Sequence, residues 1–173
     1  MDNPVNKGNG LLNIREGKVL SFGELLLRIC PDAQGEWLQQ NVLPFFVGGA
    51  EANMASALAL WDVPTAYCSV IPDNIMTRQI GEYLQQKQVD ISKIIYAGDK
   101  LGLYFLPKGG ELKHAGVIYD RLNSSFSQIR PGQIDWDDLL TDVSLFHFSA
   151  ISPAINQDVQ DYLPCFLEWT RLD

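Results

Sequence analysis

Short apolar runs alternate with segments of helical periodicity along most of this chain. The runs at residues 19–22, 25–29 and 65–71 predict β-strands. An alanine-rich segment at 50–61 predicts a helix between the second and third of these strands. Such alternation of strands and crossover helices is typical of an α/β fold with a parallel sheet.

The turn Pro72-Asp73-Asn74 predicts the start of an amphipathic helix, with Asn74 as its N-cap. We expect the buried face of this helix to carry four apolar side chains, those of Ile75, Ile80, Tyr83 and Leu84. Residues 89–96 then form the run that returns the chain to the sheet.

The next segments break this alternation. Residues 101–106 and 117–119 flank Pro107-Lys108-Gly109-Gly110 and predict two antiparallel strands joined by a loop. Three further elements are expected, a short helix at 136–140, a buried parallel strand at 144–148 and a helix at 156–170. The pattern therefore predicts an α/β core with a small antiparallel flap over the carboxyl ends of the strands, where open α/β sheets bind ligands.

Composition indicates a globular protein with an ordinary core. The chain has 173 residues, of which 46% are hydrophobic and 20% are charged. Residues 1–17 are rich in Asn, Gly and Lys, so we expect a flexible tail there and the folded part at 18–173. Three widely spaced cysteines, Cys30, Cys68 and Cys165, lie in apolar contexts and favour reduced core thiols in a cytoplasmic protein.

Charge argues against several classes of partner. The formal net charge is −8, whereas binding to a phosphate backbone needs clustered Lys and Arg, so we do not expect nucleic acid as a partner. No apolar run is long enough to predict a membrane-spanning helix. The two histidines, His114 and His147, lack a Cys or carboxylate at ligand spacing, so no metal site is expected, and His147 is expected to be a core residue.

A glycine pair joins an apolar run to the first helix. Gly48 and Gly49 allow the backbone to approach a ligand closely, and the free N–H groups of a helix start favour oxygen-rich ligands. Ala50 opens the helix, and Asn53 in its first turn offers an amide donor and acceptor. The alternative is an ordinary strand-to-helix turn without a ligand.

The flap carries three side chains with binding chemistry. Tyr104 and Tyr119 can stack on a polar ligand or form hydrogen bonds with it, and Arg121 offers a planar fork suited to a carboxylate. The alternative is that the tyrosines only pack within the strands and that the arginine is solvated.

Five short motifs occur in a characteristic order along the chain. They are Gly23-Glu24, Gly48-Gly49-x-x-x-Asn53, Leu101-Gly102-Leu103-Tyr104, Tyr119-Asp120-Arg121-x-Asn123-Ser124 and Phe146-His147-Phe148-Ser149-x-Ile151. Together they resemble the N-terminal half of a ribokinase-like, or PfkB-type, sugar kinase. The Gly-Leu-Tyr strand followed by Tyr-Asp-Arg is most similar to 2-keto-3-deoxygluconate kinases, which phosphorylate a sugar acid using ATP and Mg²⁺.

The resemblance implies a fold and a set of site residues. The fold would be the N-terminal part of a ribokinase-like βαβ core, with a small antiparallel β lid at about 25–47 and 100–121. The glycine element, comprising Gly48, Gly49, Ala50 and Asn53, would bind sugar hydroxyls. Tyr104 and Tyr119 would line the sugar from the lid, Arg121 would pair with the substrate carboxylate, and Ile151 would form an apolar wall.

The resemblance also implies what is missing. The family's Asp-Thr-x-Gly-Ala-Gly-Asp signature, which supplies the anion hole and the general base, has no match in this sequence. We therefore expect no catalytic or cofactor-binding residue here, no tight binding of ATP or Mg²⁺, and no kinase activity from this truncated or split chain alone. Exposed apolar edges would favour a homodimer through the lid or pairing with a missing C-terminal half.

The same residues are also compatible with two alternative functions. One is a kinase of a neutral sugar, similar to fructokinase or ribokinase. The other is a non-catalytic module for sugar-acid binding or dimerisation. A dinucleotide-binding domain is disfavoured, because the glycines follow the pattern Gly-Gly-x-x-x-Asn and not G-x-G-x-x-G.

Overall fold

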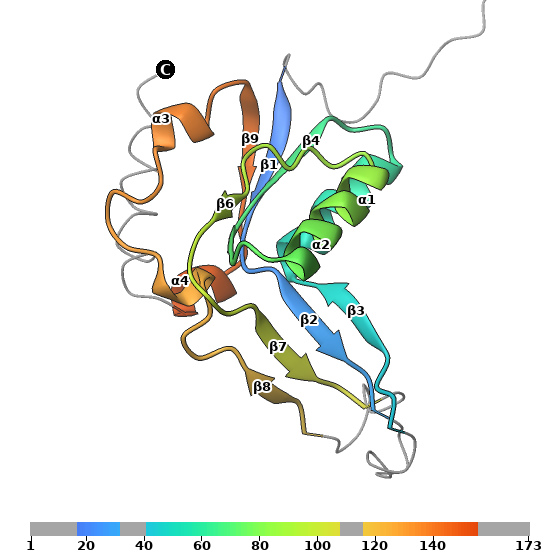
Figure 1. Cartoon of the computed structure of the whole chain (residues 1–173). Helices are drawn as coiled ribbons and strands as arrows, with labels where there is room; N and C mark the ends of the chain where they lie inside the picture. The colour runs from blue at the N-terminus through green and yellow to red at the C-terminus, as the bar shows by residue number, and fades with distance from the viewer. Residues whose placement is uncertain (1–16, 32–40, 108–115, 156–173) are drawn as a thin grey trace, which may run out of the picture.

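The protein is described by a computed structural model covering residues 17–31, 41–107 and 116–155. Its core is a parallel sheet with β1 (Lys18–Phe22) in the middle, β4 (Thr65–Cys68) on one side and β9 (Val143–His147) on the other. Figure 1 shows these three strands side by side in the upper part of the molecule. The predicted α/β core is confirmed.

The lid is a second sheet that extends from one end of the core (Figure 1). Its four strands lie in the order β3 (Phe45–Gly48), β2 (Leu26–Ile29), β7 (Gly102–Phe105) and β8 (Ile118–Asp120). The β7–β8 pair is antiparallel as predicted, and so is β2–β3, whereas β2 and β7 run parallel. Only three residues separate β1 from β2, so the lid begins directly where the central core strand ends.

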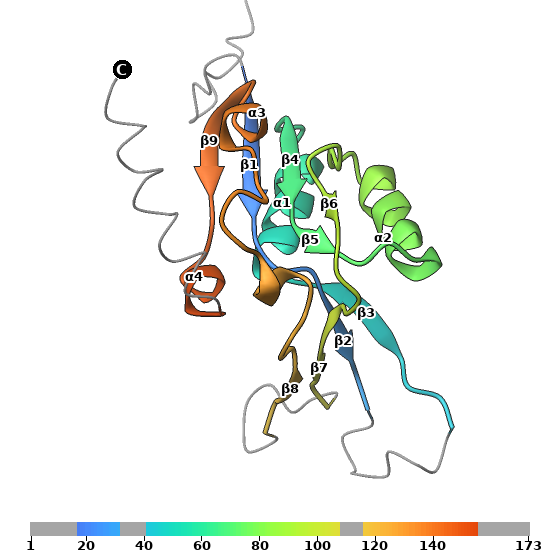
Figure 2. The same cartoon turned by 60° about the vertical axis from the view of Figure 1, so that its left-hand side comes forward.

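Helices cover both faces of the core sheet. Side chains alternate along β1 and β4, so neighbouring residues pack into two different hydrophobic cores, one on each face of the sheet. Tyr67 packs with residues of α1 (Ala50–Leu60) and α2 (Ile75–Gln86), whereas Phe22 packs with Phe126 of the 3₁₀ turn η1 (Phe126–Gln128) and with Leu139 of α3 (Trp136–Leu139). Figure 2 shows α1 and α3 on opposite sides of the sheet.

The predicted strand at 65–71 is wrong in one respect, because it consists of two strands in different sheets. β4 pairs with β1, but β5 (Val70–Ile71) pairs with β6 (Ile95–Tyr96). Between them, the Ser69 hydroxyl accepts a hydrogen bond from the Leu25 amide at 3.3 Å, where the chain of β1 departs toward the lid. The run predicted at 89–96 forms a strand only at β6, preceded by an isolated bridge between Ala66 and Asp90.

The start of α2 follows the sequence prediction, but its buried face does not. Ile80 and Leu84 are buried as expected, whereas Ile75 is 80% exposed and Tyr83 is 40% exposed. Residues that point to the core follow helical spacing of three or four, and here that series is Thr77, Ile80, Gly81 and Leu84. The expected positions of Ile75 and Tyr83 were therefore wrong.

Asn74 caps α2 through a reciprocal capping box. Its side-chain oxygen accepts from the Thr77 amide at 3.0 Å, and the Thr77 hydroxyl accepts from the Asn74 amide at 3.2 Å. Asn74→Ala should therefore lower the free energy of unfolding by about 1 kcal/mol, measured by denaturant titration. Asn74→Ser, which keeps a capping oxygen, is the control, and an equal loss in both variants would contradict the capping role.

β9 is parallel to β1 as predicted but is not buried along its length. Leu145 is 46% exposed. Within the described residues β9 pairs with β1 alone, so its other edge carries no strand. The expectation of a buried strand was wrong, because none of the five residues of β9 is buried and no described strand covers its outer edge. After β9 the chain turns into α4 (Ile151–Ile155).

Some predictions lie outside the described residues. These are the tail at 1–16, the loop residues 108–110, His114, the helix at 156–170 and Cys165. Within the part of the chain that is described, no helix has the length and apolar character needed to cross a bilayer.

Cys68 and Cys30 are both free thiols in different surroundings. Cys68 is fully buried in β4, and this burial raises its pKa to about 12. Cys30, at the end of β2, is only part-buried, so the expected core position applies to Cys68 and not to Cys30. We expect iodoacetamide at pH 8 to alkylate Cys30 in the native protein and leave Cys68 unmodified, measured by peptide mass spectrometry. Equal labelling of both would contradict this, and denaturant should expose both.

Candidate functional site

A pocket lies at the junction of the core and the lid, next to the end of β1. Its volume is about 190 Å³, room for about six water molecules at roughly 30 Å³ each. The residues that line it are Glu24, Leu26, Gly49, Ala50, Glu51, Asn53, Tyr104, Tyr119, Arg121, Ile151, Ser152 and Ile155. The structure thus brings together all the predicted site residues except Gly48, which packs beneath Tyr104.

Gly49 forms the floor of the pocket and the N-cap of α1. Its φ is 121°, and a Cβ there would lie 2.5 Å from the carbonyl oxygen of Glu24. Only glycine fits such a position. The backbone N–H of Asn53 donates to the Gly49 carbonyl at 3.0 Å, so the backbone N–H groups of the three preceding residues have no intrahelical acceptor. Among the described residues no other acceptor is found for them, and the start of α1 lines the pocket.

Tyr104 and Tyr119 form a cross-strand pair on the lid. They lie opposite each other in the antiparallel β7–β8 ladder, with ring centroids 5.9 Å apart and an interplanar angle of 31°. Burial raises the pKa of the Tyr104 phenol, whereas Tyr119 is 59% exposed. The Tyr104 phenol therefore remains a protonated donor at neutral pH, and the two rings offer an aromatic wall to a polar ligand.

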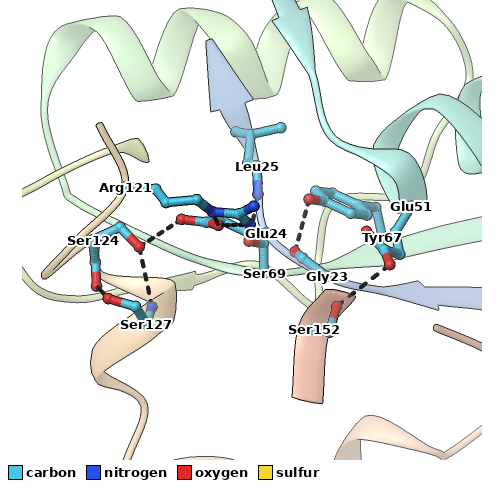
Figure 3. A network of polar contacts seen from close by, with 10 residues as sticks. All are labelled: Gly23, Glu24, Leu25, Glu51, Tyr67, Ser69, Arg121, Ser124, Ser127 and Ser152. Carbon is cyan, nitrogen blue, oxygen red and sulfur yellow. Dashed lines mark hydrogen bonds and ion pairs between the residues drawn. The ribbon is translucent and has the colours of Figure 1, made fainter. Parts of the chain in front are cut away.

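Arg121 forms an ion pair with Glu24, a residue that is only 3% exposed. Both its Nε, at 2.8 Å, and its Nη2 donate to the same carboxylate oxygen, Oε2. The other oxygen, Oε1, accepts from the hydroxyl of Ser124. Figure 3 shows Arg121 and Ser124 both directed at Glu24, so the end of the lid strand β8 is tied to the end of the core strand β1.

This ion pair was missed at the level of sequence. The resemblance implied that Arg121 pairs with a substrate carboxylate, and the alternative was a solvated side chain. The structure supplies an internal partner from 97 residues earlier in the chain. The available signal was Glu24 itself, a carboxylate beside Gly23 at the end of an apolar strand, where α/β folds place ligand-binding residues.

Glu51 is a second buried carboxylate at the pocket, at 2% exposure. Its Oε1 accepts from the Ser149 amide at 2.8 Å and from the Ser152 hydroxyl at 3.4 Å. The turn after β9 and the start of α4, where Ile151 lies, are thereby tied to the first turn of α1. A Cβ at Gly23 would lie 2.1 Å from Oε2 of Glu51, so the carboxylate also depends on a glycine opposite it. Sequence reasoning missed Glu51 as well.

The end of β1 is held by two further bonds visible in Figure 3. The Tyr67 hydroxyl donates to the Gly23 carbonyl at 2.9 Å, and burial raises the pKa of this phenol well above its ordinary value. The Leu25 amide donates to Ser69. The backbone on each side of Glu24, at Gly23 and at Leu25, is therefore held in place by a hydrogen bond.

The site is chemically suited to a ligand with many hydroxyl groups. It combines helix-start amides, two phenols, an asparagine amide and one guanidinium with two buried carboxylates. In the described part of the chain no group of three or more His, Cys, Asp or Glu side chains is placed to hold a metal ion. The pocket thus supplies binding groups for a polar ligand.

Comparison with known proteins gives a consistent result. Residues 16–166 match the family described as pfkB family carbohydrate kinase. The chain is 27% identical over 145 residues to a 2-dehydro-3-deoxygalactonokinase of Haloferax volcanii, covering 83% of this chain and 45% of that protein. It is 28% identical over 142 residues to fructokinase-1 of Oryza sativa subsp. japonica, covering 80% of this chain and 43% of that one.

Comparison with solved structures is consistent with this family match. The crystal structure of a 2-dehydro-3-deoxygluconokinase from Thermotoga maritima superimposes with a TM-score of 0.80 at 30% identity. That alignment covers 90% of this chain and 48% of the other. The chain spans about half the length of the curated relatives it matches, with 45% and 43% of the two proteins above covered.

Proposed function

Because this chain belongs to the pfkB family of carbohydrate kinases, we propose that it carries the sugar-binding half of an ATP-dependent kinase that phosphorylates a sugar acid such as 2-keto-3-deoxygluconate. The observation that carries the proposal is a guanidinium in a sugar-sized pocket with one edge still available. Glu24 accepts hydrogen bonds from Nε and Nη2 of Arg121, and among the described residues no group accepts one from Nη1. A guanidinium can donate hydrogen bonds to a second carboxylate from that end.

The remaining groups fit the rest of such a substrate. The free amides at the start of α1 and the side chain of Asn53 would bind sugar hydroxyls. Tyr104 and Tyr119 would line the sugar from the lid, and Ile151, the first residue of α4, would form the apolar wall. Gly48 would act indirectly, by leaving room for Tyr104.

Phosphoryl transfer would need groups beyond those described. A sugar kinase needs a base within reach of the attacking hydroxyl and donors that stabilise charge on the transferred group. The family's Asp-Thr-x-Gly-Ala-Gly-Asp signature is not in this sequence. We therefore propose that ATP and Mg²⁺ act in the complete family fold in the cytoplasm, and that this polypeptide alone is inactive and does not bind them tightly.

The lid is a candidate for pairing with a second copy or with another chain. Phe45 and Phe46 on β3 and Ile118 on β8 are each more than half exposed. Large exposed apolar side chains gathered on one sheet favour association. This part of the proposal is tested separately, by analytical ultracentrifugation of the purified chain.

Isothermal titration calorimetry of the folded chain tests the proposed substrate. We expect 2-keto-3-deoxygluconate to bind and a neutral hexose such as fructose to bind at least tenfold more weakly, a difference of about 1.4 kcal/mol. Circular dichroism confirms folding in each experiment. Equal binding of both sugars would contradict the sugar-acid assignment while keeping the family function.

A neutral-sugar kinase is the second candidate, and one observation favours it. The pocket holds two buried carboxylates against one guanidinium, and this excess of negative charge disfavours an acid relative to a neutral sugar. Preferential binding of fructose would support this candidate. A non-catalytic sugar-acid-binding or dimerisation module is the third, and it would bind the acid with no ATP-dependent turnover even when completed by a C-terminal half.

A further inference from the structure

We infer that Glu24 is a positioning residue that fixes Arg121 so that the guanidinium presents its Nη1 end to the carboxylate of an acidic sugar. The inference rests on the proposed function, since it assigns a specificity role at the same site. The rival possibility is that Glu24 competes with the substrate carboxylate for Arg121. The two predict opposite effects of removing Glu24.

The bonding of Glu24 is complete within the protein. Oε2 accepts from Nε and Nη2 of Arg121, and Oε1 accepts from Ser124. The residue is 3% exposed, and a Cβ at Gly102 would lie 2.6 Å from Oε1, so the carboxylate fills a space left by a glycine of β7. A carboxylate packed and bonded in this way cannot swing into the pocket to meet a ligand.

The hydrogen bonds from Arg121 to Glu24 occupy one edge of the guanidinium and leave its Nη1 end without a bond to Glu24. Glu24 uses the edge formed by Nε and Nη2. Arg121 also lies near the face of Tyr119, with Cζ 5.8 Å from the ring centroid, which limits rotation of the side chain. The Nη1 end is therefore the part of the guanidinium without a hydrogen bond in the described structure, on a residue that lines the pocket.

An arginine that is already oriented loses less entropy when it binds a carboxylate than a mobile one. Glu24 also weakens acid binding through like-charge repulsion, so the net effect depends on which contribution is larger. We expect orientation to be larger, because Glu24 and Arg121 neutralise each other and the hydrogen bonds to the ligand depend on direction.

The test compares Glu24→Ala with Ser124→Ala, which removes one bond to Glu24 and leaves the ion pair with Arg121 intact. Affinities for 2-keto-3-deoxygluconate and for fructose are measured by calorimetry on the full chain. Glu24→Ala should weaken acid binding at least about tenfold more than it weakens fructose binding, whereas Ser124→Ala should keep acid binding within about threefold. Tighter acid binding in Glu24→Ala, or equal losses for both sugars, would overturn the inference.

A ligand-free measurement separates this inference from the proposed substrate. In NMR spectra selective for arginine side chains, the Arg121 Nε–H signal should be protected from solvent exchange in the wild type and in Ser124→Ala, and lost in Glu24→Ala. Glu24→Gln keeps an acceptor and serves if Glu24→Ala does not fold, with partial protection expected. If the wild type binds no acid, the substrate assignment fails, and an Arg121 signal unaffected by either Glu24 variant would overturn the positioning role.

Discussion

Replacing Arg121 with alanine should weaken binding of the sugar acid by roughly 10- to 150-fold and lower the free energy of unfolding by about 3 kcal/mol. The stability loss follows from the ion pair, since Glu24 is buried and would lose its charged partner. The binding loss follows from the missing charge-assisted hydrogen bonds, about 1.5–3 kcal/mol, which is a factor of roughly 10 to 150. Denaturant titration and calorimetry measure the two effects separately.

Two further variants separate binding from folding. Arg121→Lys keeps a positive charge beside Glu24 but lacks the planar fork, so it should retain most of the stability and still lose acid affinity. The double variant Glu24→Ala/Arg121→Ala removes both charges and should be more stable than Arg121→Ala alone, because no charge is left unpaired. A stable Arg121→Ala chain with full acid affinity would contradict both the ion pair and the proposed substrate contact.

Replacing Gly49 with alanine should lower the free energy of unfolding by about 3 kcal/mol or more and weaken sugar binding more than tenfold. The φ of 121° is unfavourable for any side chain, and the new Cβ would meet the Glu24 carbonyl oxygen at 2.5 Å. Backbone strain of about 1–3 kcal/mol and a steric cost of similar size add together here. The contact is with backbone, so only movement of the glycine turn or of β1 could relieve it.

Gly116→Ala is the matched control for this substitution. A Cβ at Gly116 would have no neighbour within 4 Å among the described residues, so its effect on stability and binding should be small. Thermal and denaturant unfolding give the stability of both variants, and calorimetry with the preferred sugar gives their affinity. Similar stability of the Gly49 and Gly116 variants would contradict the strained glycine turn.

The sequence by itself determined the local features of this protein. The strand and helix pattern, the Asn74 cap, the glycine turn before α1 and the antiparallel β7–β8 pair were all predicted, and the family match agrees with the motif order. These features depend on residues close together in the chain. Side-chain periodicity, capping and the conformational freedom of glycine act over a few residues, so they leave a readable pattern.

The tertiary structure alone decided how those elements divide and what they bury. It split the run at 65–71 between two sheets, left one edge of β9 without a strand in the described chain, and exposed Ile75. Each outcome depends on which strand or helix lies alongside. Apolar residues indicate that a segment is able to pack, but the neighbour determines which side of it does so.

The same holds for the charges of the candidate site. Arg121 and Glu24 lie 97 residues apart in the chain, and Ser149 lies 98 residues from Glu51. No spacing rule connects such residues, because their contacts arise only when the lid folds onto the core and β9 aligns with β1. The sequence therefore identified the residue types of a sugar site, and only the fold decided which of them already have partners.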